Sequence, residues 1–227
     1  MKVVMGSRGS HLALWQSEWA KATILKTCVD LDIEIQVIQT AGDVNLAASF
    51  LEIGRKGVFT KEVDEALLSG RADFSVHSLK DLPTTMTAGL KLTAVSPRAD
   101  VRDALVSHDG LHLSQLRQGA RVATSSLRRQ ALLRSERPDL EILPLRGNVD
   151  TRLRRLETEN LDAIVLASAG LERLGRCGRV VRRCDVSTGG VVSSDAQLGD
   201  AQLGAPLWPG ERRASRAADV QPLARPV

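Results

Sequence analysis

A lysine and an aspartate stand side by side where an apolar segment ends. Residues 72–78 alternate as a half-buried strand does, Lys80 and Asp81 follow, and Pro83 stops any continuing central strand. In open α/β sheets, ligands bind at the carboxyl ends of strands, so this cation and carboxylate could bind a charged ligand and act on it. The alternative interpretation is an exposed ion pair without a function.

Two turns in the second half of the chain combine hydroxyl groups with arginines. Thr124, Ser125 and Ser126 follow a strand pattern and open a helix pattern, immediately before Arg128 and Arg129. Free amide groups and hydroxyls at a helix start, next to two guanidinium groups, are typical of an anion receptor.

The second turn repeats this arrangement. Arg146 and Arg152 flank the start of the next helix, and Gly147 between them allows a tight turn. Arg173 is a third position that could be a helix cap or a ligand contact. Each turn taken singly could be a capping cluster, but together they predict a ligand with several negative charges.

These residues must be positioned by alternating strands and helices, which predicts an α/β fold. In the first half we expect strands near 2–5, 33–40, 72–78 and 90–96 and helices near 11–27 and 59–69. In the second half we expect strands near 103–107, 121–124, 140–145 and 162–167 and helices near 126–135, 149–157 and 168–174. The pattern pauses near residue 97, so we predict two α/β domains, 1–97 and 98–184, with a ligand cleft between them.

Two further features concern the first domain. Ser10 is a plausible N-cap for a helix whose apolar stripe contains Leu12, Trp15, Trp19 and Ala22, so we interpret both tryptophans as core residues. The long connection between residues 38 and 59 carries three glycines and is interpreted as a mobile lid.

Composition narrows the function classes. The chain has 227 residues, 43% hydrophobic content, 3% aromatics and a net charge of +4, and all seven lysines lie before residue 92. The later basic residues are therefore all arginine, whose planar fork of donors suits carboxylates or phosphates. Several arginines, such as Arg134, Arg137, Arg154 and Arg155, fit solvated helix faces.

Other partners and sites are not expected. With few aromatics and no basic run longer than two residues, nucleic-acid binding is not predicted. No apolar run is long enough for a membrane span, and the amino terminus does not resemble a signal peptide. The three cysteines, Cys28, Cys177 and Cys184, show no metal-ligand spacing with the histidines, which fits a reducing compartment such as the cytoplasm, although an organelle is also compatible.

Several ordered motifs together resemble the porphobilinogen deaminase, or hydroxymethylbilane synthase, family. They are Ser-Arg-Gly-Ser at 7–10 with Leu-Ala-Leu-Trp-Gln at 12–16, Gly-Asp-Val at 42–44, Lys-Gly-Val-Phe-Thr-Lys-Glu at 56–62, His-Ser-Leu-Lys-Asp-Leu-Pro at 77–83, and the stretches 124–130, 145–152 and 169–175. Several motifs in one order are far more specific than any one of them alone.

The resemblance implies two periplasmic-binding-protein-like domains and a third, smaller domain that carries a dipyrromethane cofactor on a cysteine. It implies an enzyme, expected to be monomeric, that condenses porphobilinogen into a linear tetrapyrrole with release of ammonia. Asp81 would be the catalytic carboxylate, stabilising positive charge on pyrrole nitrogens.

By the same resemblance, a set of residues would receive the carboxylates of cofactor and growing chain: Arg8, Ser10, Ser78, Lys80, Thr124, Ser125, Ser126, Arg128, Arg129, Arg146, Arg152 and Arg173. Lys56 and Phe59 match the end of the family's active-site lid, although Glu52 stands where such lids often carry a lysine.

The carboxyl-terminal part departs from the family pattern. The attachment cysteine of the family lies in a Gly-Gly-Cys or similar turn, and neither Cys177 nor Cys184 has that setting. We therefore expect the third domain to be missing and residues 185–227 to be a poorly ordered tail outside the family pattern. The alternative function is a non-catalytic binding module for polycarboxylate pyrroles or other small anions.

Overall fold

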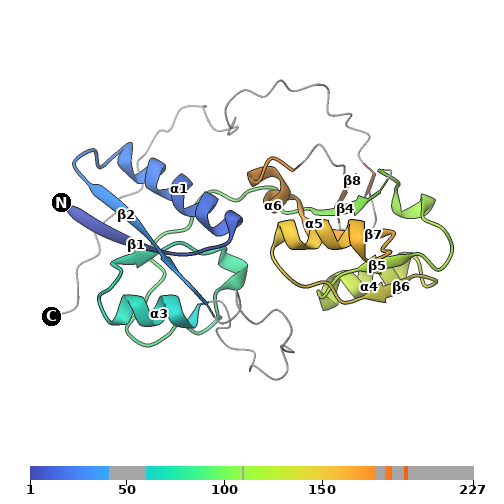
Figure 1. Ribbon diagram of the computed structural model, residues 1–227, viewed down its shortest axis with the longest axis horizontal. Coiled ribbons are helices and arrows are strands. Elements are labelled where there is room, and N and C mark those ends of the chain that lie inside the picture. Colours follow the sequence, from blue (N-terminus) through green and yellow to red (C-terminus); the bar gives the residue numbers. More distant parts are fainter. Residues whose placement is uncertain (41–59, 109, 177–181, 186–191, 194–227) are drawn as a thin grey trace.

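The chain forms two α/β lobes, each built on its own sheet, in a computed structural model that describes residues 1–40, 60–108, 110–176, 182–185 and 192–193. Figure 1 shows the lobe that contains β1 and α3 beside the lobe that contains β5 and α5. This arrangement confirms the α/β class expected from the alternating sequence pattern.

The first lobe is built on a short parallel sheet. Its elements are β1 (Lys2–Arg8), α1 (His11–Leu25), β2 (Asp32–Ile38), α3 (Lys61–Leu68), β3 (Phe74–Ser75) and the 3-10 turn η1 (Leu79–Asp81). The strand order is β2-β1-β3, and both pairings are parallel. Because β1 is central, its last residue and the turn after β3 lie at the same edge of the sheet.

The core of this lobe is small and depends on a glycine in β1. Ile38, Val63, Ala66 and Ala72 are buried together beneath α3. A Cβ at Gly6 would lie 3.1 Å from Ile38 Cδ1 and 3.3 Å from Ala72 Cβ, so a larger residue there would press on these buried side chains.

The buried face of α1 differs from the predicted apolar stripe. Ser10 does cap the helix, as expected, but Gln16 and Ser17 are its buried residues, whereas Trp15 and Trp19 are half-buried. Ser17 Oγ donates a hydrogen bond of 2.8 Å to Ser7 Oγ, which satisfies both buried hydroxyls. The interpretation of the two tryptophans as core was therefore wrong, because the helix faces β1 through small polar side chains.

The expected strand at 90–96 is absent from the described residues of this lobe, and residues 72–78 yield only the two-residue β3. Leu92 and Val95 are exposed by 49% and 62%. The alternating pattern predicted half-buried strands, but a strand also needs a neighbour to supply its ladder hydrogen bonds.

The second lobe contains a mixed sheet. Its elements are β4 (Asp103–Ser107), η2 (Leu113–Gln115), β5 (Arg121–Ala123), α4 (Leu127–Glu136), β6 (Glu141–Leu143), α5 (Val149–Thr158), β7 (Ala163–Ala167), α6 (Ser168–Arg173), β8 (Arg182–Asp185) and β9 (Val192–Ser193). The order is β6-β5-β7-β4-β8-β9, in which β4 is antiparallel to β7 and the β5, β6 and β7 pairings are parallel.

Alternate residues of the central strands pack into two hydrophobic cores, one on each face of the sheet. Ala104, Ala123 and Ile164 pack in the cluster that contains residues of α5 and α6. Leu105, Val122 and Val165 pack in the cluster that contains residues of α4 and η2. The helices predicted at 126–135, 149–157 and 168–174 are confirmed within one residue at each end.

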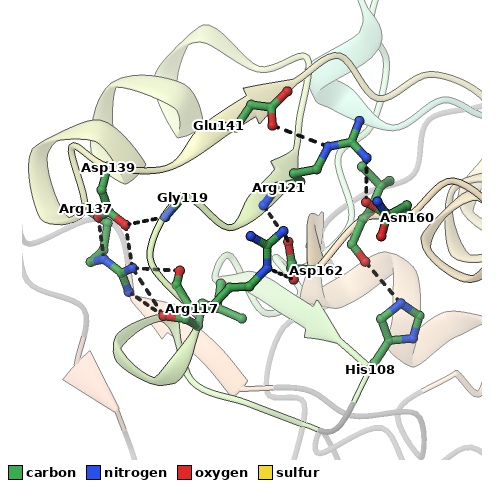
Figure 2. A network of polar contacts seen from close by, with 11 residues as sticks. His108, Arg117, Gly119, Arg121, Arg137, Asp139, Glu141, Asn160 and Asp162 are labelled. Carbon is green, nitrogen blue, oxygen red and sulfur yellow. Dashed lines mark hydrogen bonds and ion pairs between the residues drawn. The ribbon is translucent and has the colours of Figure 1, made fainter.

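The amino ends of the parallel strands carry a network of neutralised charges (Figure 2). Arg117 and Asp162 approach within 2.8 Å, and Arg137 and Asp139 within 2.7 Å. Arg137 also donates hydrogen bonds to the carbonyls of Leu113, Leu116 and Arg117. It thus holds the η2 turn and is not the solvated side chain that the sequence suggested.

Candidate functional site

The predicted ligand residues lie at one edge of each sheet. Arg8 ends β1, Lys80 and Asp81 follow β3, and the turns after β5, β6 and β7 open α4, α5 and α6. Because β4 is antiparallel to β7, its first residue, Asp103, pairs with the last residue of β7, Ala167. An aspartate therefore reaches the carboxyl-end edge of the second sheet from a strand that begins there.

Lys80 and Asp81 on the first lobe face charged groups of the second. The positive charges of Arg129 and Arg152 lower the pKa of Lys80, while Asp81 and Asp103 raise it. Desolvation is the largest cause and makes the net shift a lowering, although the side chain is solvent-accessible. Protein therefore surrounds Lys80 without covering it, so solvent still reaches the ammonium group.

Asp103 holds the two neighbouring arginines of α4. Each carboxylate oxygen accepts one hydrogen bond of 2.7 Å, from Arg128 Nη2 and from Arg129 Nη2. The carboxylate is almost fully buried, with 4% of the side chain exposed. Arg129 also donates to the Val165 carbonyl at 3.0 Å. Both arginines are therefore held by hydrogen bonds within the protein.

Arg152 completes the cationic group. Its Nε donates to the Gly147 carbonyl at 2.7 Å, so the tight turn and the side chain fix one another. Desolvation and the nearby Arg129 lower the pKa of Arg152, and Asp81 across the lobe boundary raises it. We call Lys80, Asp81, Asp103, Arg128, Arg129 and Arg152 the charged cluster.

The charged cluster has an excess of positive charge. Four cationic side chains face two carboxylates, whereas the amino-end network of Figure 2 pairs arginines with carboxylates. Arg129 Nε is buried and has no hydrogen-bond partner among the described residues. A polyanionic ligand would supply the missing negative charge.

The predicted hydroxyl ligands all have roles in local structure. Ser10 and Ser126 are N-caps of α1 and α4. Ser125 Oγ donates to the Leu145 carbonyl at 2.9 Å, and Thr124 Oγ1 accepts from the Ser126 amide at 3.2 Å. Ser78 exchanges hydrogen bonds with Gln16. Ser10 and Ser126 therefore act as helix caps, as the alternative interpretation of these residues predicted. A role of their hydroxyls in ligand binding stays a prediction.

The remaining predicted arginines differ in their positions. Arg8 lies close enough to His77 for its charge to contribute to a lowered pKa of that imidazole, for which burial is the main cause. Arg146 is half-buried in the turn before α5.

Arg173 lies in the contact between α6 and α1. Its guanidinium carbon is 5.4 Å from the Trp15 ring centroid, within the range of a cation–π interaction. Burial lowers its pKa.

A second contact joins α1 to the start of α5. His11 Nδ1 and Asp150 Oδ2 are 2.9 Å apart, and Asp150 also accepts a hydrogen bond of 3.1 Å from Arg176.

Some predictions fall outside the described residues, among them the lid, with Lys56, Phe59 and Glu52, and the tail beyond Asp185 except β9. Within the part of the chain that the structure describes, no helix is long and apolar enough to cross a bilayer. No group of three or more His, Cys, Asp or Glu side chains is placed to hold a metal ion in that part either.

Two members of this region were not anticipated from the sequence. Asp103 carries no motif signal apart from its place at the start of an apolar strand, and only the antiparallel pairing of β4 brings it to Arg128 and Arg129. Gln16 lies in a helix whose buried face was predicted from its apolar stripe alone. Its Nε2 donates a hydrogen bond of 2.9 Å to Ser78 Oγ, two residues before Lys80.

Comparisons with known proteins agree on one family. The model described as "Porphobilinogen deaminase, dipyromethane cofactor binding domain" matches residues 3–197. The porphobilinogen deaminase of Syntrophotalea carbinolica is 46% identical over 209 residues, which cover 92% of this chain and 65% of that protein. That of Pelobacter propionicus is 48% identical over 182 residues, which cover 80% of this chain and 58% of that protein.

Among solved structures, a TRAP periplasmic solute binding protein from Desulfovibrio salexigens has a TM-score of 0.43 and 13% sequence identity, covering 80% of this chain and 61% of that one.

The chain is a two-lobed α/β protein with arginines gathered at the carboxyl-end edge of the second sheet. The matches to the family model and to the curated relatives show that the chain belongs to the porphobilinogen deaminase family. It spans 65% and 58% of the length of the two relatives.

Proposed function

We propose that this chain binds porphobilinogen between its lobes and performs the deaminating condensation of a porphobilinogen deaminase, also called hydroxymethylbilane synthase. The observation that carries the proposal is that Lys80 and Asp81 of the first lobe lie near arginines of the second, which hydrogen bonds to Asp103 and Gly147 hold in place, in a cluster that has excess positive charge. A catalytic carboxylate beside carboxylate-binding cations suits a substrate that carries acetate and propionate groups and a basic leaving group. The products would be ammonia and a linear tetrapyrrole.

In this proposal Asp81 is the catalytic residue. An ionised carboxylate only accepts hydrogen bonds, so it can stabilise the positive charge that develops on a pyrrole nitrogen as the amino group leaves. Lys80, Arg129 and Arg152 would hold substrate carboxylates and orient the ring against Asp81. The excess positive charge of the cluster is lowered when these carboxylates bind.

The charged cluster also suits a dipyrromethane cofactor, which carries acetate and propionate groups of its own. The exposed part of Arg128 leaves donors for additional carboxylates. When bound, the cofactor supplies the pyrrole carbon to which a substrate unit is joined. This chain's residues would bind its carboxylates and keep its ring nitrogens near Asp81.

Further residues are proposed as secondary contacts of cofactor and chain. Their shared property is a cation or hydroxyl near the carboxyl-end edges: Arg8, Ser10, Ser78, Thr124, Ser125, Ser126, Arg146 and Arg173. Lys56 and Phe59 are proposed to belong to a lid. We also propose that the protein acts as a monomer in the cytoplasm or an organelle, without nucleic acid.

The test compares binding and turnover of porphobilinogen by the whole chain. Calorimetry measures saturable binding, and an aldehyde-reagent colour assay together with ammonia release measures condensation. We expect Asp81→Asn to keep binding within about threefold and to lose turnover by about 100-fold, since it removes charge but keeps shape. Arg152→Gln should weaken binding itself.

Glu18→Gln, an exposed change on α1, is the matched control and should alter neither measurement. Binding without condensation by the unmodified chain would favour the alternative function, a receptor for polycarboxylate pyrroles. Equal turnover by Asp81→Asn and the unmodified chain would contradict the assignment of Asp81.

A further inference from the structure

Asp103 is the most buried charged residue of the region, and none of the motifs that define the site includes it. Only 4% of its side chain is exposed, and each oxygen accepts one guanidinium hydrogen bond of 2.7 Å. Burying a carboxylate costs desolvation free energy, which its two charge-assisted hydrogen bonds must offset. Such a pairing is therefore weak evidence for a purely stabilising role.

The two partners are consecutive residues at the start of α4. Side chains one position apart do not face each other on a helix, and two guanidinium groups repel one another. One carboxylate with an oxygen for each group draws both to one place and reduces their repulsion. The backbone contact of Arg129 with Val165 fixes the second group further.

The bonds to Asp103 leave donors for a ligand. A guanidinium has five N–H donors in a planar fork. Among the described residues, Asp103 is the hydrogen-bond partner found for Arg128, whose side chain is 57% exposed. Arg129 is only 13% exposed, and its Nε is buried. Arg128 is thus held at the surface, whereas Arg129 is held largely out of solvent.

We propose that Asp103 is a positioning residue that holds Arg128 and Arg129 as a paired receptor for the carboxylates of pyrrole ligands. This inference rests on the proposed function for the identity of the ligand. The position of β4 supports it, because the strand runs against β7 and delivers its first residue to the edge where the parallel strands end.

The influence of Asp103 reaches the catalytic lobe. Its negative charge raises the pKa of Lys80, in opposition to the lowering by Arg129 and Arg152. An uncharged residue at this position would have no such effect. Removing the charge should therefore lower the pKa of Lys80 further.

The first experiment measures porphobilinogen binding by calorimetry for the whole chain and three variants. Asp103→Asn should weaken binding by about tenfold, as expected when two charged donors lose their orientation. Asp103→Glu, which keeps the charge, should recover part of that loss. Asp162→Asn is the matched control, because Asp162 also pairs with an arginine but lies at the amino-end network, and it should change binding less than about twofold.

The second experiment needs no ligand. In ¹⁵N spectra of arginine-labelled protein, the Nη resonances of Arg128 and Arg129 should show restricted rotation in the unmodified chain and faster rotation in Asp103→Asn. The Asp162→Asn control should leave them unchanged. A lysine-labelled sample should show the Lys80 pKa lower in Asp103→Asn.

These readouts separate the two proposals. If the unmodified chain does not bind porphobilinogen, the proposed function fails, and the ¹⁵N spectra still decide whether Asp103 positions the arginines. Unchanged affinity in Asp103→Asn, or unchanged rotation of both guanidinium groups, would overturn the role of Asp103. If Asp103→Asn does not fold, Asp103→Glu is compared with the unmodified chain by the same spectra. Unchanged rotation of the Arg128 and Arg129 guanidinium groups in Asp103→Glu, in which the carboxylate is displaced, would then overturn the positioning role of Asp103.

Discussion

Lys80 shows how neighbours from both lobes set the behaviour of one side chain. Desolvation lowers its pKa, Asp81 next to it raises it, and Arg129 and Arg152 on the second lobe lower it. An ammonium group at this position is thus less tightly protonated than a free lysine. Binding of ligand carboxylates would reverse the effect, because negative charge favours the protonated form.

Replacement of Arg152 tests this coupling at the residue scale. Arg152→Gln should raise the pKa of Lys80, because it removes one of the positive charges that disfavour the ammonium form. The measurement is an NMR titration of lysine side chains in the whole chain. Arg155→Gln is the control, since Arg155 is paired with Glu159 at 2.7 Å and should leave Lys80 unchanged. A Lys80 pKa that stays constant in Arg152→Gln would show that the lobes do not approach each other in solution.

At the scale of elements, the turn before α5 depends on a glycine with positive φ. Gly147 has φ of +101°, and a Cβ there would lie 2.7 Å from Thr151 Cγ2. The carbonyl of Gly147 accepts the Arg152 Nε hydrogen bond. The backbone conformation of Gly147 and the position of the Arg152 side chain are therefore linked within one turn.

Gly147→Ala should lower the free energy of unfolding by about 2–4 kcal/mol, through the combined effect of backbone strain and a steric clash. Urea unfolding followed by circular dichroism measures it. Gly119→Ala is the matched control, with φ of +65° but no atom within 4 Å of the added Cβ, and it should cost only about 1 kcal/mol. Equal losses would contradict the clash with Thr151.

The loop–strand connections at the opposite edge depend on ionised aspartates. The hydrogen bond from Arg137 and the Gly119 amide hold the pKa of Asp139 well below its usual range. Burial raises the pKa of Asp162, but the hydrogen bonds from Arg117 and the Arg121 amide outweigh it, so the net shift is downward. Both groups therefore stabilise the folded chain in the ionised form (Figure 2).

The sign of the pH dependence follows from these lowered pKa values. The stabilisation is complete above the unfolded-state pKa of about 4 and is lost as pH falls through the lower folded-state values. Asp139→Asn should lower the thermal midpoint at pH 7, and the difference from the unmodified chain should shrink below about pH 3. Glu18→Gln should have no such effect. A deficit that is the same at pH 7 and at pH 2 would contradict this account.

At the scale of the whole molecule, α1 of the first lobe contacts residues of the second lobe. Trp15 packs under Arg173, His11 approaches Asp150, and a Cβ at Gly170 would lie 3.7 Å from Leu12 Cδ2. Figure 1 shows α6 of the second lobe close to one end of α1 of the first. These contacts, together with the coupling of Asp81 to Arg152, fix how the two edges face one another.

Removal of the α1 contacts should loosen the pair of lobes. In the double variant His11→Ala/Trp15→Ala we expect a larger radius of gyration by small-angle scattering, with far-ultraviolet circular dichroism unchanged. Glu18→Ala, on an exposed position of the same helix, is the control. A radius of gyration equal to that of the unmodified chain would show that other contacts hold the lobes together.

Much of the architecture followed from local patterns. Period-two and helical spacing predicted the strands and helices of the second lobe, and Ser10 was correctly identified as a cap, because these features depend on residues close in sequence. The motifs also predicted the family correctly. The strand at 90–96 and the core role of Trp15 were wrong, since the partner of a strand and the buried face of a helix depend on distant residues.

The tertiary structure alone decided which charges meet. The sequence indicated that arginines after strands would bind anions, because residue type and position at a turn suffice for that prediction. It held no sign that β4 runs antiparallel to β7, and this direction places Asp103 against Arg128 and Arg129. Electrostatic partners are set by distance in space, and a pairing between residues 25 and 26 positions apart leaves no local pattern.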